Sequence, residues 1–102
     1  MRNYRISSEA LFDIAEIWRY IARDSFDQAD LVEEAIYSNC AMVGENPQIG
    51  HKRADLTPKA VRFWPVLPYE NYLLVYNPDL RPVQIVRVMH AARRRVWQPA
   101  KS

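Results

Sequence analysis

The distribution of proline divides this chain of 102 residues into two halves with different folding options. All seven prolines lie after residue 46, and both glycines, Gly44 and Gly50, lie at the boundary. Proline disrupts the interior of a helix but is accepted in turns and at the edges of sheets. The first half can therefore form long helices, whereas the second half favours short strands joined by turns.

The first half has helical spacing of its apolar residues, interrupted once. After a strand-like opening at residues 4–6, Ser7 and Ser8 offer an N-cap, and residues 24–27 break the pattern and supply a second cap. The apolar lines on either side of this break are Leu11, Ile14, Ala15, Trp18, Ile21 and Ala22, and then Ala29, Val32, Ile36, Cys40 and Val43. This spacing predicts a helical hairpin.

Three strand-like segments follow a linker at residues 46–53. They lie at residues 61–67, 72–76 and 83–89 and are separated by short, turn-rich pieces, which predict antiparallel pairing. Pro65 cannot donate to a ladder, so its strand is expected to lie at a sheet edge or to carry a bulge. A second set of residues, Tyr72, Leu74 and Tyr76, is expected to share one core-facing side.

Alternation predicts which residues of the last strand face the helices. With a period of two, Val86, Val88 and His90 share one face, and the odd-numbered residues 85–89 share the other. If the two valines face the helices, Arg87 points away from the core, toward the open face of the sheet.

Together these elements predict one α+β domain over residues 1–102, with a helical hairpin packed on an antiparallel sheet. The expected order is strand, helix, helix and three strands, with the hairpin over about residues 8–45, the sheet over about 60–91 and a basic tail over 92–102. Cys40, His51 and His90 lack the spacing of a zinc site, so no metal or cofactor is expected. No long apolar run or secretory signal is visible, which favours a cytoplasmic protein without a membrane span.

The formal net charge of +2 conceals a strong polarisation along the chain. Residues 1–50 hold four Lys/Arg against nine Asp/Glu, whereas residues 51–102 hold ten against three. From Arg81 onward there is no acidic residue. This basic end favours acidic partners such as nucleic acid or an acidic protein segment, although a run such as Arg93–Arg95 is also typical of a solvated tail.

The motifs of several common enzyme classes are missing from the sequence, including a phosphate-binding glycine loop and a nucleophile elbow. The remaining chemical candidates are Arg87 and His90, which could bind a phosphodiester and transfer a proton. Both residues also have a structural interpretation. A histidine at a strand end commonly bonds to backbone or to a carboxylate, and Arg87 can pair with an acidic residue such as Asp55 or Glu70.

Several segments, in this order, resemble the RelE/ParE superfamily of bacterial toxins, and specifically its ParE branch. The matching residues are Tyr4, Ile6 and Ser7; Ala10, Asp13, Ile17 and Tyr20–Ala22; Pro47, Gly50, Arg53, Asp55 and Leu56; Tyr72, Leu74 and Tyr76; and Ile85–Arg93. The resemblance spans nearly the whole chain. It implies the compact fold of that family, with two helices packed on an antiparallel sheet.

The superfamily contains two mechanisms. RelE-like members cut messenger RNA on the ribosome, whereas ParE-like members poison DNA gyrase without a known catalytic centre. Nuclease members often have an arginine where this chain has Leu73, and the C-terminal aromatic residue is Trp97, which cannot transfer a proton. One departure adds charge, because ParE-like chains usually have an aspartate where this chain has Arg94.

The resemblance therefore implies the toxin of a type II toxin–antitoxin system that inhibits DNA gyrase by binding. A cognate ParD-like antitoxin of the ribbon–helix–helix class would neutralise it in a hetero-oligomer. Two alternatives stay open: a ribosome-dependent endoribonuclease that uses Arg87, His90 and Arg93, and a non-toxic co-repressor that acts with the antitoxin.

Two sets of residues are the candidate binding sites. For the target we expect Arg87, Arg93, Arg94, Arg95 and Trp97. For the antitoxin we expect Leu31, Ala35 and Met42, a second apolar line on the second helix, together with Trp64 beside the strand edge near Pro65. The alternative for the helical line is that it packs inside the hairpin.

Overall fold

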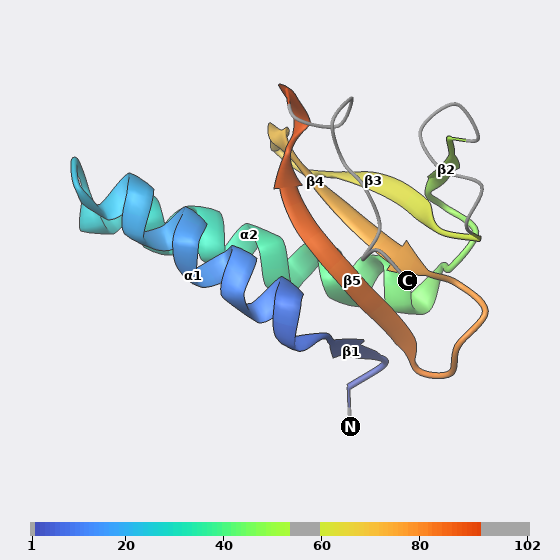
Figure 1. The fold of residues 1–102 in the computed structure, drawn as a ribbon. Coiled ribbons are helices and arrows are strands. Elements are labelled where there is room, and N and C mark those ends of the chain that lie inside the picture. The colour runs from blue at the N-terminus through green and yellow to red at the C-terminus, as the bar shows by residue number, and fades with distance from the viewer. Residues whose placement is uncertain (1, 54–59, 93–102) are drawn as a thin grey trace.

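The computed structural model describes residues 2–53 and 60–92 as two layers, a helical hairpin on one face of a five-stranded sheet (Figure 1). The loop between the two helices projects beyond the sheet. The elements are β1 (Tyr4–Ile6), α1 (Ser8–Ala22), α2 (Phe26–Glu45), β2 (His51–Lys52), β3 (Arg62–Val66), β4 (Tyr69–Asn77) and β5 (Val83–His90). The predicted α+β class and helical hairpin are confirmed.

Both helices begin at the serine caps that the sequence predicts. The Ser7 hydroxyl accepts a hydrogen bond from the backbone N–H of Ala10 at 3.0 Å, and the Ser25 hydroxyl accepts one from Gln28 at 3.0 Å. Each bond satisfies one of the N–H groups that a helix start leaves without an intrahelical partner. The caps therefore fix where the two helices of the hairpin start.

The main core lies between the hairpin and the sheet. All five residues of the predicted line on α2 are buried, and four of them, Val32, Ile36, Cys40 and Val43, belong to this core together with Tyr72, Leu74 and Tyr76 of β4. On α1 the buried line is displaced from the predicted one. Ala10 and Ile14 are buried, whereas Leu11 is exposed, because α1 packs against both α2 and β5 and turns its contact face accordingly.

The sheet differs from the predicted one in two ways. Its order is β1-β5-β4-β3-β2, and β1 runs parallel to β5, so the sheet is mixed rather than antiparallel. The predicted linker also contains β2, in which His51 pairs with Phe63 of β3. Because β2 forms the edge, β3 is an inner strand, and the register shift after Pro65 is the bulge that proline there favours.

The alternation predicted for β5 is wrong over its first half. The register shifts between Val75 and Tyr76, so that Arg87 pairs with Val75 while Ile85 pairs with Tyr76. Val86 is the extra residue of this bulge and packs on the face away from the helices, and Ile85 lies in the helix-facing core instead. The bulge reverses the facing of the residues before it.

A second apolar cluster covers the sheet face away from the hairpin. Its buried members are Val61, Phe63, Val75 and Met89, with Leu73 and Val86 packed against them. The sheet is therefore apolar on both faces over its central strands, and the hairpin covers one of these two faces.

Candidate functional site

Arg87 is joined to helix α1 through Asp13. Its Nε lies 2.7 Å from Asp13 Oδ2 and its Nη2 lies 2.9 Å from Oδ1, and the backbone N–H of Val88 donates to the same Oδ2 at 2.9 Å. These hydrogen bonds raise the pKa of Arg87, against the opposing effect of burial. Arg87 lies opposite Val75 and shares its sheet face, away from the helices as predicted, but its guanidinium reaches Asp13 of α1, which is its partner among the described residues rather than Glu70. The other expected partner, Asp55, lies outside the described residues.

His90 lies exposed at the end of β5. Its Nδ1 accepts a hydrogen bond from the backbone N–H of Ala92 at 3.2 Å, and its ring meets the Tyr72 ring edge-on at 5.5 Å. Burial, and to a lesser degree the neighbouring Tyr20, raise the pKa of Tyr72. Within residues 2–53 and 60–92, no hydrogen bond or ion pair joins His90 to Arg87, so these two candidate residues are not brought together. Arg93, Arg94, Arg95 and Trp97 lie outside the described residues.

The expected antitoxin line on α2 is exposed at both ends. Leu31 is 50% exposed and Met42 is 37% exposed, while Ala35 between them is half-buried against the core. The alternative, in which the line packs inside the hairpin, therefore fits Ala35 but not Leu31 or Met42. Trp64 is half-buried, and its Nε1 donates to the Oδ1 of the buried Asn39 at 3.1 Å. Its indole is thus anchored to α2.

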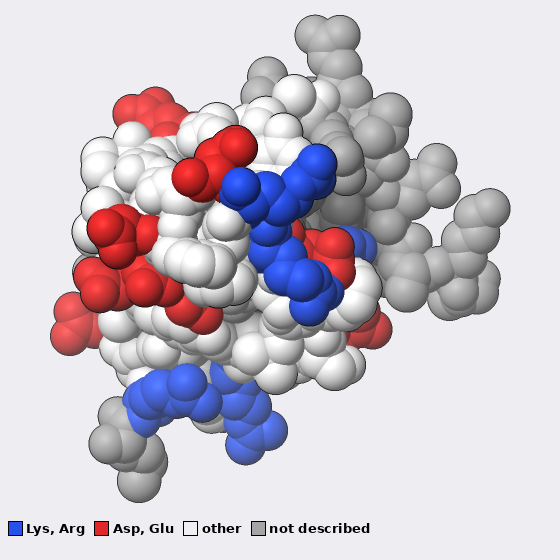
Figure 2. Space-filling view, turned by 90° about the vertical axis from the view of Figure 1, so that its left-hand side faces the viewer, with Lys and Arg blue, Asp and Glu red and all other residues white. Residues whose placement is uncertain are grey.

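The hairpin carries further exposed apolar residues that the sequence did not indicate. They are Leu11, Phe12, Tyr20 and Phe26. Residues 8–45 also hold nine Asp/Glu against two Lys/Arg, and Figure 2 shows acidic side chains gathered on one side of the hairpin, viewed from its loop end. The outer face of the hairpin is therefore apolar with acidic surroundings.

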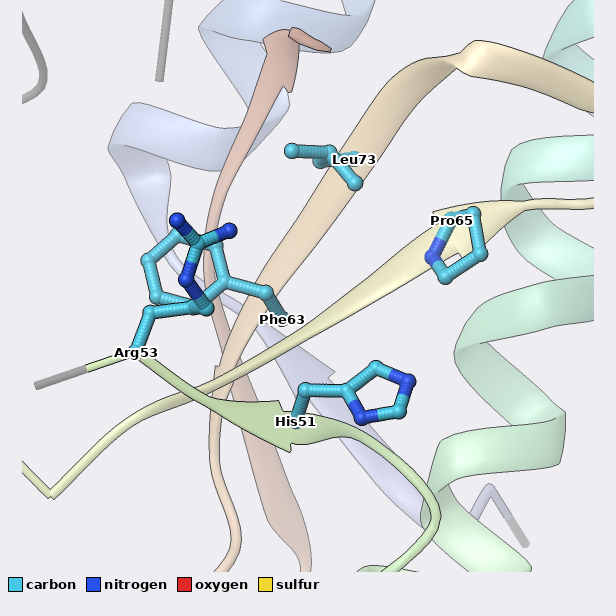
Figure 3. A pocket seen from close by; sticks show the side chains of 5 residues that line it. All are labelled: His51, Arg53, Phe63, Pro65 and Leu73. Atoms are coloured by element: carbon cyan, nitrogen blue, oxygen red, sulfur yellow. The ribbon is translucent and has the colours of Figure 1, made fainter. Parts of the chain in front are cut away.

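A small pocket lies on the opposite side of the sheet. Its volume is about 140 Å³, and it is lined by His51, Arg53, Phe63, Pro65 and Leu73 (Figure 3). Periodicity does not reveal this pocket, because β2 lies in the segment predicted to be a linker. The one sequence signal for the pocket is the alternation along residues 61–67, which places Phe63 and Pro65 on the same side of their strand.

Within residues 2–53 and 60–92, no group of three or more His, Cys, Asp or Glu side chains is placed to hold a metal ion. Neither described helix is long and apolar enough to cross a bilayer. The candidate surfaces are thus the end of β5, the outer face of the hairpin and the pocket on the sheet.

Comparisons with known proteins agree with this fold. The structure of the "Chromosomal ParDE TA system from P. aeruginosa" contains a chain that superposes with a TM-score of 0.70 at 18% sequence identity, covering 88% of this chain and 96% of that one. No curated protein matches the sequence significantly. The profile of the family described as "ParE toxin of type II toxin-antitoxin system, parDE" matches residues 4–95. Because that match covers most of the 102 residues, the chain belongs to the ParE toxin family.

Proposed function

We propose that this ParE-family toxin inhibits DNA gyrase by binding, and that a cognate ParD-like antitoxin with a ribbon–helix–helix domain neutralises it. The observation that carries a binding mechanism is the engagement of Arg87, which is held by both oxygens of Asp13. A guanidinium bound in this way is positioned as part of the fold, whereas an endoribonuclease would need it on the scissile phosphate. Gyrase acts in the cytoplasm, so the proposal places the protein there.

The hydrogen bond at His90 also favours binding over catalysis. In a neutral imidazole one nitrogen accepts and the other carries the proton. Because Nδ1 accepts from the backbone N–H of Ala92, that nitrogen is engaged with the protein's own backbone in this conformation rather than open to a substrate. The endoribonuclease alternative with Arg87, His90 and Arg93 would require both described side chains to change partners.

The target contacts proposed for this toxin are basic residues at the C-terminal end of the chain. Arg93, Arg94, Arg95 and Trp97 combine three cations with an aromatic anchor, which is a frequent pairing in binding hot spots. Arg87 contributes through the exposed 38% of its side chain. An acidic protein surface or the DNA bound to gyrase would complement this charge.

The antitoxin is proposed to cover the outer face of α2. Leu31 and Met42 offer exposed apolar contacts, while Ala35 and Trp64 are half-buried and pack against the core. The acidic surroundings favour an antitoxin segment that carries basic residues beside its apolar ones. The product is a hetero-oligomer in which the toxin is held inactive.

Inducible expression in a bacterium tests the mechanism directly. Gyrase poisoning predicts DNA breaks and an SOS response, whereas an endoribonuclease predicts translation arrest with cleaved messages. Replacing Arg93, Arg94 and Arg95 together by alanine should abolish growth inhibition, and co-expression of the antitoxin should relieve it. A chain that is not toxic, and that binds operator DNA only with its antitoxin, would identify a co-repressor instead.

The variant His90→Gln separates binding from catalysis. It retains hydrogen-bonding capacity but lacks a titrating proton, so a toxin that acts by binding should stay toxic. Loss of general acid–base help typically costs about 10²–10⁴ in rate, so an endoribonuclease that uses His90 would become harmless. A folded His90→Gln protein that loses toxicity and messenger cleavage together would replace gyrase inhibition by the endoribonuclease mechanism.

A further inference from the structure

The pocket on the sheet face away from the hairpin is built from two cross-strand pairs. His51 of β2 lies opposite Phe63 of β3, and Pro65 of β3 lies opposite Leu73 of β4. Side chains opposite each other on neighbouring strands lie close together, and residues two apart on one strand share a face. Arg53, which follows β2, completes the lining (Figure 3).

The size and the walls of this pocket fit one apolar side chain. Phe63 is only 4% exposed and forms a buried wall, while Pro65 and Leu73 are half-buried. The volume of about 140 Å³ is close to that of an apolar cavity of about 150 Å³ that binds benzene. A phenyl ring or a branched aliphatic side chain is therefore the matching ligand group.

A hydrogen-bonded latch holds the segment before β2 against the sheet. The Tyr76 hydroxyl accepts from the backbone N–H of Gly50 at 2.9 Å and donates to the carbonyl of Pro47 at 2.7 Å. Arg62 donates to the Gly50 carbonyl at 2.7 Å. A Cβ at Gly50 would lie 2.6 Å from that hydroxyl, so the approach requires glycine. The β2 side of the pocket is thus formed in advance, which lowers the entropic cost of binding.

The charge around the pocket is opposite to that of the hairpin. Lys52 and Arg53 lie on or next to β2, and residues 46–53 and 60–92 together hold five Lys/Arg against two Asp/Glu. A ligand segment rich in carboxylates would be attracted to this half and repelled by the hairpin. Charge complementarity therefore favours an acidic segment as the occupant.

We infer that the protein target of this toxin inserts an aromatic or branched aliphatic side chain, carried by an acidic segment, into the pocket formed by His51, Arg53, Phe63, Pro65 and Leu73. This inference rests on the proposed action by binding a protein target. It assigns the target to the sheet face, and the antitoxin to the outer face of α2 on the other side of the molecule. A nucleic acid would bind the cations and leave the pocket empty, since its bases stack on exposed aromatic faces and Phe63 is buried.

The test measures two affinities of the full-length toxin in parallel, for purified gyrase holoenzyme and for the antitoxin. Leu73→Lys fills the pocket with a charged chain, and Arg53→Glu reverses the charge at its rim. Each should weaken gyrase binding at least about tenfold and leave antitoxin binding within about twofold. The matched controls Leu80→Lys and Arg81→Glu, at exposed positions in the β4–β5 turn, should change neither affinity by more than about twofold.

Three outcomes with folded variants would overturn the inference. Gyrase affinity that is unchanged in Leu73→Lys and Arg53→Glu removes the pocket from the target interface. Loss of antitoxin binding instead of gyrase binding assigns the pocket to the antitoxin. A salt-sensitive loss in Arg53→Glu without any loss in Leu73→Lys indicates a nucleic acid. If Leu73→Lys does not fold, the peptide comparison below decides instead, because it tests the apolar contact in the unaltered pocket.

A second measurement keeps this inference separate from the proposed function. Should wild-type toxin not bind gyrase at all, the gyrase proposal fails by itself. The peptide Ac-Glu-Glu-Phe-Glu-Glu-NH2 should then still shift the amide resonances of Phe63 and Leu73 in isotope-labelled toxin. The same peptide with glycine in place of phenylalanine should not. Absence of any difference between the two peptides at about 1 mM, the range of a single-side-chain contact, overturns the pocket as an apolar binding site.

Discussion

The hairpin meets the sheet through mainly apolar side chains at α2, whereas the contact of α1 with β5 adds polar and charged groups to the buried Ala10 and Ile14. The inner residues of α2, including Ile36 and Val43, are fully buried against β4 and its neighbours. At β5 the carbonyl of Val86 accepts from the Ser7 hydroxyl at 2.9 Å, and Asp13 binds Arg87 and the N–H of Val88. One layer contact excludes charge and the other depends on it.

The difference follows from the length of β1. This strand pairs with Val83–Ile85 only, so the rest of β5 has backbone groups at a sheet edge with no strand beside them. Unsatisfied backbone groups are costly, and an open edge invites pairing with other chains. Ser7 and Asp13 of α1 supply the missing partners for Val86 and Val88. A helix can thus close a strand edge with side chains, here with the cap hydroxyl of Ser7 and the carboxylate of Asp13.

The sharpest test of this comparison is truncation of the inner and outer faces of α2. Ile36→Ala should lower the free energy of unfolding by about 3 kcal/mol, because it leaves a cavity in a fully buried site. Leu31→Ala, on the exposed line, should change it by less than about 0.5 kcal/mol. Urea denaturation of both variants measures the difference. Equal losses would mean that the outer line is part of the core.

Periodicity predicted the inner face of α2 but failed at β5, because periodicity describes an element only where its packing is regular. The inner face of α2 packs on one continuous surface, so a single stripe of apolar residues describes it. Helix α1 contacts both α2 and β5, which is why Leu11, the first residue of the predicted apolar line, is exposed. In β5 the bulge at Val86 shifts the register, and nothing local in the sequence marks it.

The candidate sites were predictable only where local signals exist. The apolar line of Leu31 and Met42 follows from helical spacing, and its exposure was one of two options. The pairing of Asp13 with Arg87 spans 74 residues and could not be read from either segment alone. The sheet pocket depends on β2, whose two residues are too few to show a strand pattern.

The second largest effect should come from the charged joint at β5. Asp13→Ala removes the acceptor for Arg87 and for the N–H of Val88 and should cost about 2 kcal/mol of stability. The value lies at the low end for a broken pair because the Arg87 side chain is 38% exposed to solvent. Denaturant unfolding of the variant provides the measurement.

The control for this joint is Glu16→Ala on the same helix. Glu16 pairs with Arg19, and both side chains are more than half exposed, so its loss should cost less than about 0.5 kcal/mol. If Asp13→Ala proves no more destabilising than Glu16→Ala, the contact of α1 with β5 does not depend on the charged pair.

A smaller effect is expected when charge is placed on the outer face of α2. Leu31→Glu and Met42→Glu should each leave folding intact, since both side chains are exposed, but should weaken antitoxin binding about tenfold, or about 1.4 kcal/mol. Titration calorimetry with purified antitoxin measures this change, with Leu80→Glu on the sheet side as the matched control. Unchanged affinity in both helix variants would remove this face from the antitoxin interface.

The smallest effect concerns Cys40, a titratable group within the apolar contact of α2. Burial raises its pKa from an ordinary value near 9 to about 12, so the folded protein keeps the thiol protonated where the unfolded chain ionises. This contribution to stability is complete below pH 9 and is lost progressively between pH 9 and 12. At pH 9.5 the loss amounts to about 1 kcal/mol.

Comparison with Cys40→Ala isolates that contribution. Burial also raises the pKa of Tyr72 and Tyr76, which are present in both proteins and cancel in the difference, and the pKa of Tyr37, which Cys40 raises further, lies above the pH range compared. The free energy of unfolding of the wild type should therefore fall by about 1 kcal/mol more than that of Cys40→Ala between pH 7 and 9.5. Parallel pH profiles would show that the thiol reaches solvent, and that the contact of α2 with the sheet tolerates charge as the joint at β5 does.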